Sequence, residues 1–247
     1  MTPDRVIAAI DGTWPPARMI GSGPWTLREG QGGGQRVSAT TLSRPATPAE
    51  LAREIPQAEA AMLALGQTQL FMIRPQDDML DAELATRGYA LHDPVRAWAC
   101  APDTLCDLPI PRVTAFAIWE PLAIMREIWE AGGIDAGRQA VMARAHGPKT
   151  GLLGRWKDKP AAAAFVAIHE GVAMLHALEV LPHQRRQGVA GWMMRAAAVW
   201  ARENGADTLA VLCTRANAPA NALYAALAMT PVTDYHYRRK GEEAPTT

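Results

Sequence analysis

Apolar residues recur along one stretch of the chain with the spacing of a single helix face. The helix is expected to end at Asn204 and Gly205, a pair typical of a left-handed stop. Before it, a short apolar strand over residues 178–181 ends at Pro182, because proline has no amide hydrogen for a strand ladder. The pattern therefore predicts a strand, a short loop and an amphipathic helix, whose apolar positions, three and four residues apart, are Val189, Trp192, Met193, Ala196, Ala197 and Trp200.

The loop between this strand and helix has the composition of an anion-binding turn. Gly188 has no Cβ, so a ligand can approach the backbone where the helix begins, and Ala190 and Gly191 keep the first turn open. The first N–H groups of a helix have no intrahelical partner, and Arg185 and Arg186 stand beside them. Such a turn favours a phosphate or another anion. The P-loop and Rossmann glycine patterns are both missing from this stretch, which excludes those two sites here.

A second motif follows the first in a fixed order. Residues 209–214 predict a strand, and after it come Asn217 and the pair Leu223 and Tyr224 on a predicted helix. The two patterns, [QR]-x-x-G-x-[GA] at 185–190 and N-x-x-A-x-x-L-Y at 217–224, resemble motifs A and B of the GNAT acetyltransferase superfamily. The resemblance is strong over residues 113–240 and weak over 1–105. At one position it departs: Ala228 and Met229 stand where the family has Gly-Phe, and a less strained turn is expected there.

The resemblance implies roles for the residues of both motifs. In GNAT proteins the loop N–H groups bind the pyrophosphate of acetyl-CoA, and the preceding strand contacts the pantetheine and the thioester carbonyl. The Tyr of motif B protonates the departing thiolate, which points to Tyr224, and the Asn often contacts the cofactor, which points to Asn217. Two alternatives remain: Tyr224 as ordinary core packing, and Arg185 as a solvated loop charge. The implied cofactor-binding residues on the strand and loop are Leu178, Val180, Arg185, Arg186, Gln187, Gly188, Val189, Ala190 and Gly191.

The sequence offers several candidates for the general base, the group that takes the proton of the attacking amine. Glu179 lies on the strand beside the expected thioester and is the first candidate, acting directly or through a water molecule. Strand alternation places its side chain on the face opposite Leu178 and Val180. His176 and His169 are alternatives, because an unperturbed imidazole titrates near pH 6.5. Positioning alone can also supply much of the acceleration, without a dedicated base.

The order of predicted elements in the second half is that of a complete GNAT domain. We therefore expect an α/β (α+β) fold with a mixed, mostly antiparallel twisted sheet flanked by helices. In the first half, we expect a helix at 4–12, strands at 25–29 and 35–42 joined by a mobile glycine-rich hairpin, a helix from the Thr47 cap to Leu65, a strand at 69–74 and a helix at 79–86. A phosphate-loop interpretation of those glycines lacks the following Lys-Ser/Thr and helix.

The first half also repeats the order of the second. Placing Gly88 on Ala228 gives an offset of 140 residues (228 − 88). Under that offset Pro48 and Glu50 occupy the places of Gly188 and Ala190, so an N–H is missing and a carboxylate repels phosphate. We expect two tandem GNAT-like domains, the first without a cofactor site; the alternative is an unrelated α/β cap. The predicted boundaries are a degenerate domain at 1–105, a linker at 106–112, a catalytic domain at 113–240 and a disordered tail at 241–247.

Composition narrows the classes of partner. Lys+Arg and Asp+Glu both number 25 in 247 residues, so no basic field attracts nucleic acid, and we expect no nucleic-acid partner. Three cysteines without C-x-x-C spacing indicate neither a disulfide framework nor a metal site. No apolar run approaches the ~18 residues of a membrane span. A cytoplasmic protein that does not bind membranes, as a monomer or homodimer, is expected.

The predicted activity is acetyl transfer from acetyl-CoA to a primary amine within a ternary complex. The first choice of acceptor is a small molecule or an amino-acid derivative, and the second is a protein N-terminus or lysine. Trp119, Trp129 and Trp156 are candidates for an aromatic wall of the acceptor site or for ordinary core positions. A hypothesis of another class is a non-catalytic module that binds acyl-CoA and regulates a partner.

Overall fold

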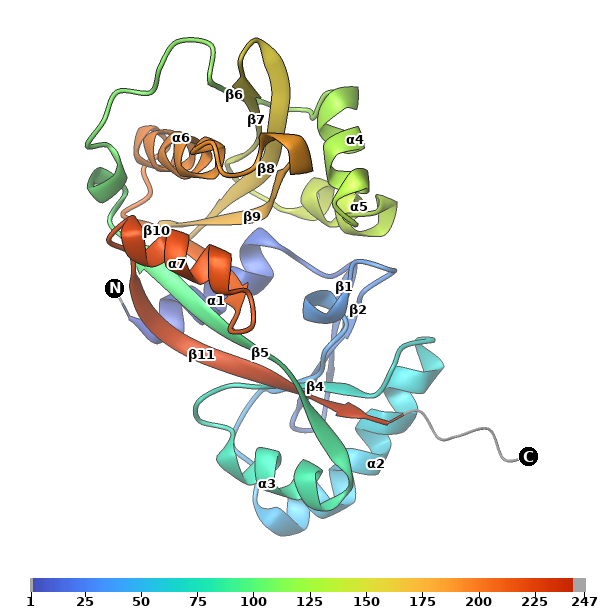
Figure 1. Ribbon diagram of the computed structural model, residues 1–247. Coiled ribbons are helices and arrows are strands. Elements are labelled where there is room, and N and C mark those ends of the chain that lie inside the picture. Colours follow the sequence, from blue (N-terminus) through green and yellow to red (C-terminus); the bar gives the residue numbers. More distant parts are fainter. Residues whose placement is uncertain (1, 242–247) are drawn as a thin grey trace. The chain divides into compact units, whose positions relative to one another are not determined.

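Two compact units, interleaved along the sequence, make up the computed structural model (Figure 1), which describes residues 2–241. Within this range, unit 1 comprises residues 2–15, 97–213 and 217–232, and unit 2 comprises 16–96, 214–216 and 233–241. The predicted domain boundaries at 105 and 113 divide the sequence into two consecutive segments, and they stay a prediction. The predicted tail, apart from its first residue, lies outside the described residues.

The helices agree closely with those predicted from periodicity and capping. The strand predicted at 209–214 also matches, and the one predicted at 178–181 is the end of a longer strand that begins at Val172 and ends at Val180. The helices are α1 (Pro3–Thr13), α2 (Pro48–Ala64), α3 (Asp78–Thr86), α4 (Ala123–Ala131), α5 (Ala136–Arg144), α6 (Val189–Glu203) and α7 (Ala218–Ala226), with short 3-10 turns η1 (Gln35–Val37), η2 (Pro102–Leu105) and η3 (Pro182–Gln184). The strands are β1 (Arg18–Ser22), β2 (Trp25–Glu29), β3 (Thr41–Leu42), β4 (Leu70–Ile73), β5 (Tyr89–Cys100), β6 (Ala115–Ile118), β7 (Lys149–Trp156), β8 (Lys159–His169), β9 (Val172–Val180), β10 (Thr208–Thr214) and β11 (Thr230–Lys240).

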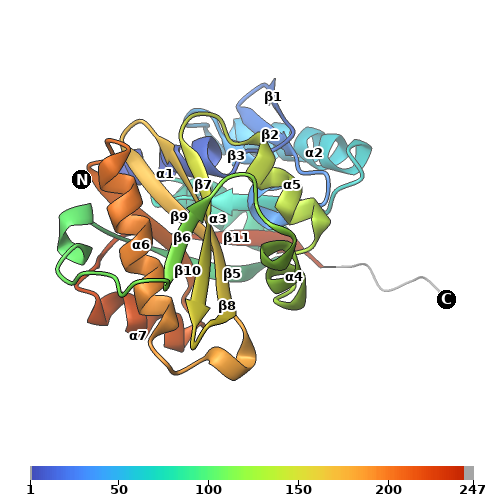
Figure 2. The same ribbon diagram turned by 90° about the horizontal axis from the view of Figure 1, so that it is seen from above.

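Unit 1 is built on a sheet whose strand order is β10-β9-β8-β7-β6. The pairs β6–β7, β7–β8 and β8–β9 are antiparallel, and β9–β10 is parallel. Ala173 and Leu175 of β9 share an apolar core with Met193 and Ala197 of α6, whereas His176 contacts Thr13 of α1. Figure 2 shows α6 and α4 on opposite sides of these strands. The sheet is therefore covered on both faces, as its apolar strands require.

Unit 2 contains the small sheet β1-β2-β3 and the strand order β4-β11-β5. Its core includes Trp25, Ile55, Phe71 and Leu80. The predicted pairing of 25–29 with 35–42 is present only at its end, where Trp25↔Leu42 and Thr26↔Thr41 join β2 to β3. A tight turn at Gly23 and Pro24 pairs the other edge of β2 with β1 (Ser22↔Trp25), and residues 35–39 coil into a helical turn closed by Ala39 N–H donating to Gln35 O at 2.9 Å. Local turn chemistry therefore overrode the apolar alternation of 35–42.

The offset of 140 residues also relates elements of the two halves. It places α3 on α7 with the same ends, α2 on α6, β4 within β10, and β5 on β11 to within one residue. Strands of one repeat pair with strands of the other. In unit 2, β4 of the first repeat pairs with β11 of the second (Ile73↔His236). Residues 97–100 of β5 belong to unit 1, where β5 is the strand next to β10. Each repeat thus gives part of its last strand to the other repeat's compact unit.

The helices within residues 2–241 are too short or too polar to cross a bilayer.

Candidate active site

The strands β9 and β10 separate halfway along their length. They pair from Thr208↔Val172 to Val211↔Leu175, and no further pair between them follows within the described chain. β9 continues to Val180 and remains paired with β8 through Ala163↔Glu179. The edge of β9 that faced β10 is therefore open over its last residues, and its backbone groups are accessible to a ligand.

A β-bulge lies where the two strands separate. The pairs Phe165↔His176 and Ala163↔Glu179 leave one residue between them on β8 and two on β9. The extra residue, Ala177, has φ of 52°, in the left-handed region. The indole N–H of Trp129, a buried side chain of α4, donates to the Ala177 carbonyl at 2.9 Å. Helix α4 thus fixes the bulge, which re-aims the residues that follow it.

After the bulge, consecutive side chains of β9 point to opposite faces. Leu178 and Val180 pack against the apolar core that contains Val189 of α6. Glu179 lies on the other face, against α4: a Cβ built on Gly132 would come within 2.4 Å of the Glu179 Cγ. The predicted alternation is therefore present, and the carboxylate lies on the face away from α6.

The loop before α6 ends in a left-handed glycine. Gly188 has φ of 78° and precedes the first residue of the helix, and no side chain caps that end. The N–H of Trp192 donates to the Gly188 carbonyl at 3.2 Å, so the N–H groups of residues 189–191 are the ones that begin α6 without intrahelical acceptors. A Cβ built on Gly188 would meet no described atom within 4 Å. The backbone here is open to an anion and carries the positive end of the helix dipole.

Two side chains tie this loop to neighbouring strands. The Arg185 guanidinium donates to the Val180 carbonyl and to Glu179 Oε1, both at 2.9 Å. Gln187 Oε1 accepts from the Trp156 indole N–H at 2.6 Å, and its amide N–H donates to the His183 carbonyl at 3.2 Å. Arg186 is exposed. Arg185 and Gln187 therefore shape the loop, which motif matching alone did not reveal.

Tyr224 and Asn217 have different surroundings although they share a motif. Tyr224 is buried in the same core as Val189, with its ring centroid 6.4 Å from that of Trp98. Burial raises its pKa, and the nearby Cys213 thiol raises it further. The phenol therefore stays protonated at neutral pH, as a proton donor must. Asn217 caps α7: its Oδ1 accepts from the Ala220 N–H at 3.2 Å. A cofactor contact of Asn217 stays a prediction.

The two candidate histidines have structural surroundings. His176 is 5% exposed, and its Nε2 lies 2.9 Å from Thr13 Oγ1. His169 lies at the other end of β9 from the loop, paired with Val172, and a Cβ on Gly12 would come within 2.2 Å of its ring. Of the base candidates, Glu179 is the one beside the loop.

The three tryptophans of the expected aromatic wall have separate contacts. Trp129 is buried on the bulge, Trp156 binds the loop through Gln187, and Trp119 is 40% exposed with Lys149 Nζ 4.7 Å from its ring centroid. The expectation of a less strained turn at Ala228 is wrong, since this residue has φ of 56°. Its Cβ makes the left-handed conformation less favourable than it is for glycine.

The site thus combines a parallel strand pair that separates, a bulge at the point of separation and an uncapped helix start. The model of the acetyltransferase (GNAT) family matches residues 117–229. This part of the chain is therefore a GNAT domain, and the N-terminal GNAT-like domain stays a prediction. No curated protein matches the sequence significantly.

Several solved structures share the fold over most of their length. A GCN5-related N-acetyltransferase from Kribbella flavida is 20% identical, with a TM-score of 0.72 over 98% of this chain and 97% of that one. A conserved protein of unknown function from Staphylococcus epidermidis has 11% identity and a TM-score of 0.68, covering 94% of both chains. A tandem GNAT protein from the clavulanic acid biosynthesis pathway has 16% identity and a TM-score of 0.57, covering 83% of this chain and 76% of that one. At these identities the similarity concerns the fold.

Proposed function

We propose that this protein is an N-acetyltransferase that moves the acetyl group of acetyl-CoA to the primary amine of a small molecule. The observation that carries the proposal is the uncapped start of α6 at Gly188, beside the open edge of β9. The free N–H groups and the open space at Gly188 suit a pyrophosphate. The half-buried backbone of 178–180, on the edge that β10 leaves, suits the amides of a pantetheine arm, although the Val180 carbonyl already accepts from Arg185.

The reaction joins the amine nitrogen to the thioester carbonyl carbon and breaks the bond from that carbon to sulfur. The nitrogen loses a proton, and the proposed acceptor is Glu179, directly or through water. The backbone N–H near Val180 is the proposed donor to the carbonyl oxygen as negative charge develops on it. Tyr224 is the proposed source of the proton that the thiolate receives, a role that its neutral phenol supports.

Calorimetric titration with acetyl-CoA tests the cofactor site. Gly188→Glu places a carboxylate at the start of α6 and should abolish binding. Gly205→Glu is a matched control: Gly205 follows the other end of the same helix, has φ of 79°, and its Cβ would also meet no described atom within 4 Å. Both variants carry the same backbone strain, so only Gly188→Glu should lose the ligand. Equal loss in both, or unaffected binding in Gly188→Glu, contradicts the proposal.

A further inference from the structure

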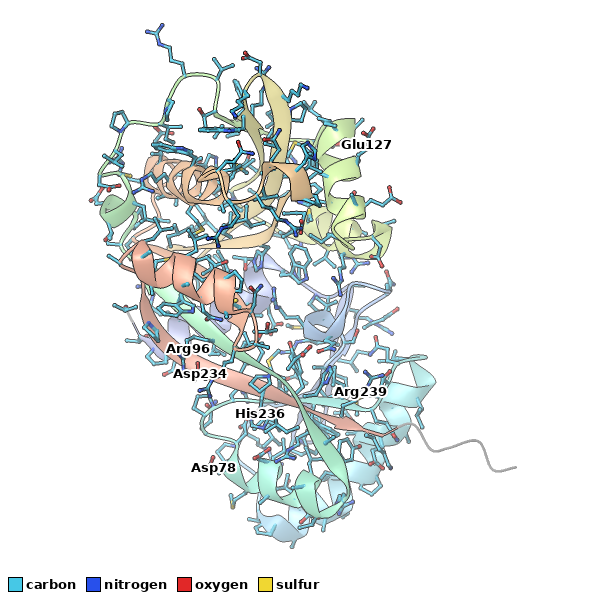
Figure 3. All side chains as sticks on the ribbon, in the orientation of Figure 1. Asp78, Arg96, Glu127, Asp234, His236 and Arg239 are labelled. Carbon is cyan, nitrogen blue, oxygen red and sulfur yellow. The ribbon has the colours of Figure 1, made fainter. Side chains whose placement is uncertain are left out.

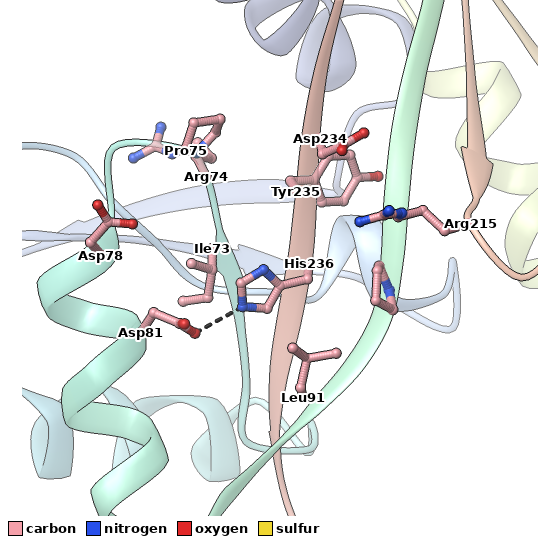
Figure 4. A pocket seen from close by; sticks show the side chains of 11 residues that line it. Ile73, Arg74, Pro75, Asp78, Asp81, Leu91, Arg215, Asp234, Tyr235 and His236 are labelled. Atoms are coloured by element: carbon pink, nitrogen blue, oxygen red, sulfur yellow. Dashed lines mark hydrogen bonds and ion pairs between the residues drawn. The ribbon is translucent and has the colours of Figure 1, made fainter. Parts of the chain in front are cut away.

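A cavity of about 230 Å³ lies within unit 2, where β4 ends and α3 begins (Figure 4). Part of its wall is apolar, and the Leu91 side chain there is 54% exposed. Such exposure of a large apolar side chain beside a cavity offers a contact for an apolar part of a ligand. The lining residues are Ile73, Arg74, Pro75, Asp78, Asp81, Leu91, Pro94, Arg215, Asp234, Tyr235 and His236.

Most charged groups in this wall are neutralised by neighbours. Asp234 accepts from Arg96 at 2.9 and 3.1 Å. Asp81 accepts from Arg238 at 2.6 Å, and Arg74 donates to Asp77 at 3.1 Å. These pairs shape the cavity and leave little net charge from the residues that form them.

Two opposite charges in the wall have no such neighbour. Among the hydrogen bonds and ion pairs formed within residues 2–241, none engages the side chain of Arg215 or of Asp78, and both are exposed. Asp78 is the first residue of α3 (Figure 3), and Arg215 lies in the turn after β10, so they reach the cavity from different elements (Figure 4). A ligand that carried a single charge would be attracted by one of these groups and repelled by the other.

His236 adds an oriented acceptor between them. Its Nε2 lies 2.8 Å from Asp81 Oδ1. The hydrogen bond from Arg238 lowers the pKa of Asp81, and that from His236 lowers it further, so the carboxylate is ionised and accepts. In the neutral imidazole, Nε2 then carries the hydrogen and Nδ1 is an acceptor. Figure 4 shows the second ring nitrogen on the side away from Asp81.

We propose that this cavity binds a free aliphatic amino acid as a zwitterion. The Arg215 guanidinium receives the carboxylate, for which its planar fork of donors is suited. His236 Nδ1 receives the ammonium group, the Asp78 carboxylate attracts it through its charge, and Leu91 contacts the aliphatic side chain. The site lies in unit 2, to which both repeats contribute and which holds Pro48 and Glu50, the counterparts of Gly188 and Ala190. It is independent of the proposed acetyl transfer.

Titration of the full-length protein with L-leucine, and with L-valine for comparison, tests this site. Two analogues each lack one charge: 4-methylpentanoate has no ammonium group, and 3-methylbutylamine has no carboxylate. We expect one saturable leucine site and at least tenfold weaker binding of each analogue. Absence of saturable binding for both amino acids, or analogues that bind as tightly as leucine, would overturn the proposal.

Three variants locate the binding within the cavity. Arg215→Gln and Asp78→Asn should each weaken leucine binding at least tenfold, while Arg112→Gln, an exposed arginine in unit 1, should leave it unchanged. Leucine should also shift the His236 ring signals in ¹H–¹³C NMR spectra of the wild type and of Arg112→Gln. Unaltered leucine affinity in Arg215→Gln, or no shift of the His236 signals in the wild type, would place the ligand elsewhere and refute the assignment.

Discussion

Arg185 of the loop and Glu179 of β9 form an ion pair with Nη2 and Oε1 2.9 Å apart, while the same guanidinium holds the Val180 carbonyl. The proposed anion-binding loop is thereby linked to the carboxylate on the opposite face of the strand. An arginine can make both contacts at once because its donors form a planar fork.

Replacing Arg185 by glutamine should weaken acetyl-CoA binding roughly fivefold to tenfold, since about one hydrogen bond's worth of loop ordering is lost. The melting temperature should change little, because this arginine side chain is 56% exposed and surface pairs contribute little to stability. Arg202→Gln, which breaks an exposed pair with Asp103 near the other end of α6, is the control. Equal affinities of the two variants in calorimetry would argue against a role of Arg185 in the loop.

Tyr224→Phe should lower kcat more than tenfold and leave the dissociation constant of acetyl-CoA unchanged, because only the proton donor is removed. The buried phenol has a raised pKa, so it is protonated below pH 10 and its ionisation should produce no break in the pH–rate profile up to that pH. Steady-state kinetics with an accepted amine measures the first effect. An unchanged kcat would remove Tyr224 from the mechanism.

Ala228→Gly should stabilise the protein by up to about 1 kcal/mol. The left-handed conformation costs a residue with a Cβ about 1–2 kcal/mol, and glycine gives back about half of that through the entropy of the unfolded chain. The converse change, Gly88→Ala, affects the corresponding residue of the first repeat, with φ of 78°, and should destabilise by a similar amount. Urea denaturation measures both, and changes of the same sign would contradict this account.

Asp81→Asn should lower the free energy of unfolding at pH 7 by about 1 kcal/mol, because hydrogen bonds from Arg238 and His236 to a partly exposed carboxylate are lost. The pKa of this carboxyl is lowered in the folded protein, so its contribution is complete above the unfolded value near 4 and is lost as the pH falls through the folded one. The difference between variant and wild type should therefore shrink below pH 4. Glu127→Gln, which changes an exposed carboxylate within α4, is the control and should show neither effect.

A fragment of residues 113–240 should not fold into a stable domain when it is expressed alone. It lacks α1, whose Val6 and Ile10 are buried and whose Thr13 is hydrogen-bonded to His176. It also lacks β5, the strand next to β10. Hydrogen exchange should show little protection in β9 and β10 of the fragment compared with the full chain. Native-like protection would mean that the predicted boundary at 113 marks an autonomous domain.

The sequence by itself determined the helices, the loop at 185–190 and the order of motifs, because these depend on local features. The period of apolar residues defines α6, and the glycine at 188 supplies the left-handed start. The offset of 140 residues between the two repeats could also be found from the sequence, because it compares residue types at numbered positions and needs no contacts.

Tertiary structure decided the features that depend on partners distant in the chain. The turn at Gly23 placed β1 beside β2, whose other edge pairs with β3, and the bulge at Ala177 depends on the indole of Trp129. The ion pair of Glu179 with Arg185 and the contact of buried His176 with Thr13 could not be predicted, because residue spacing does not show which side chains meet in the fold. The exchange of β5 and β11 between repeats was likewise hidden, because two repeats with the same strand pattern offer each last strand two equivalent places, and only the packing of the whole chain chooses between them.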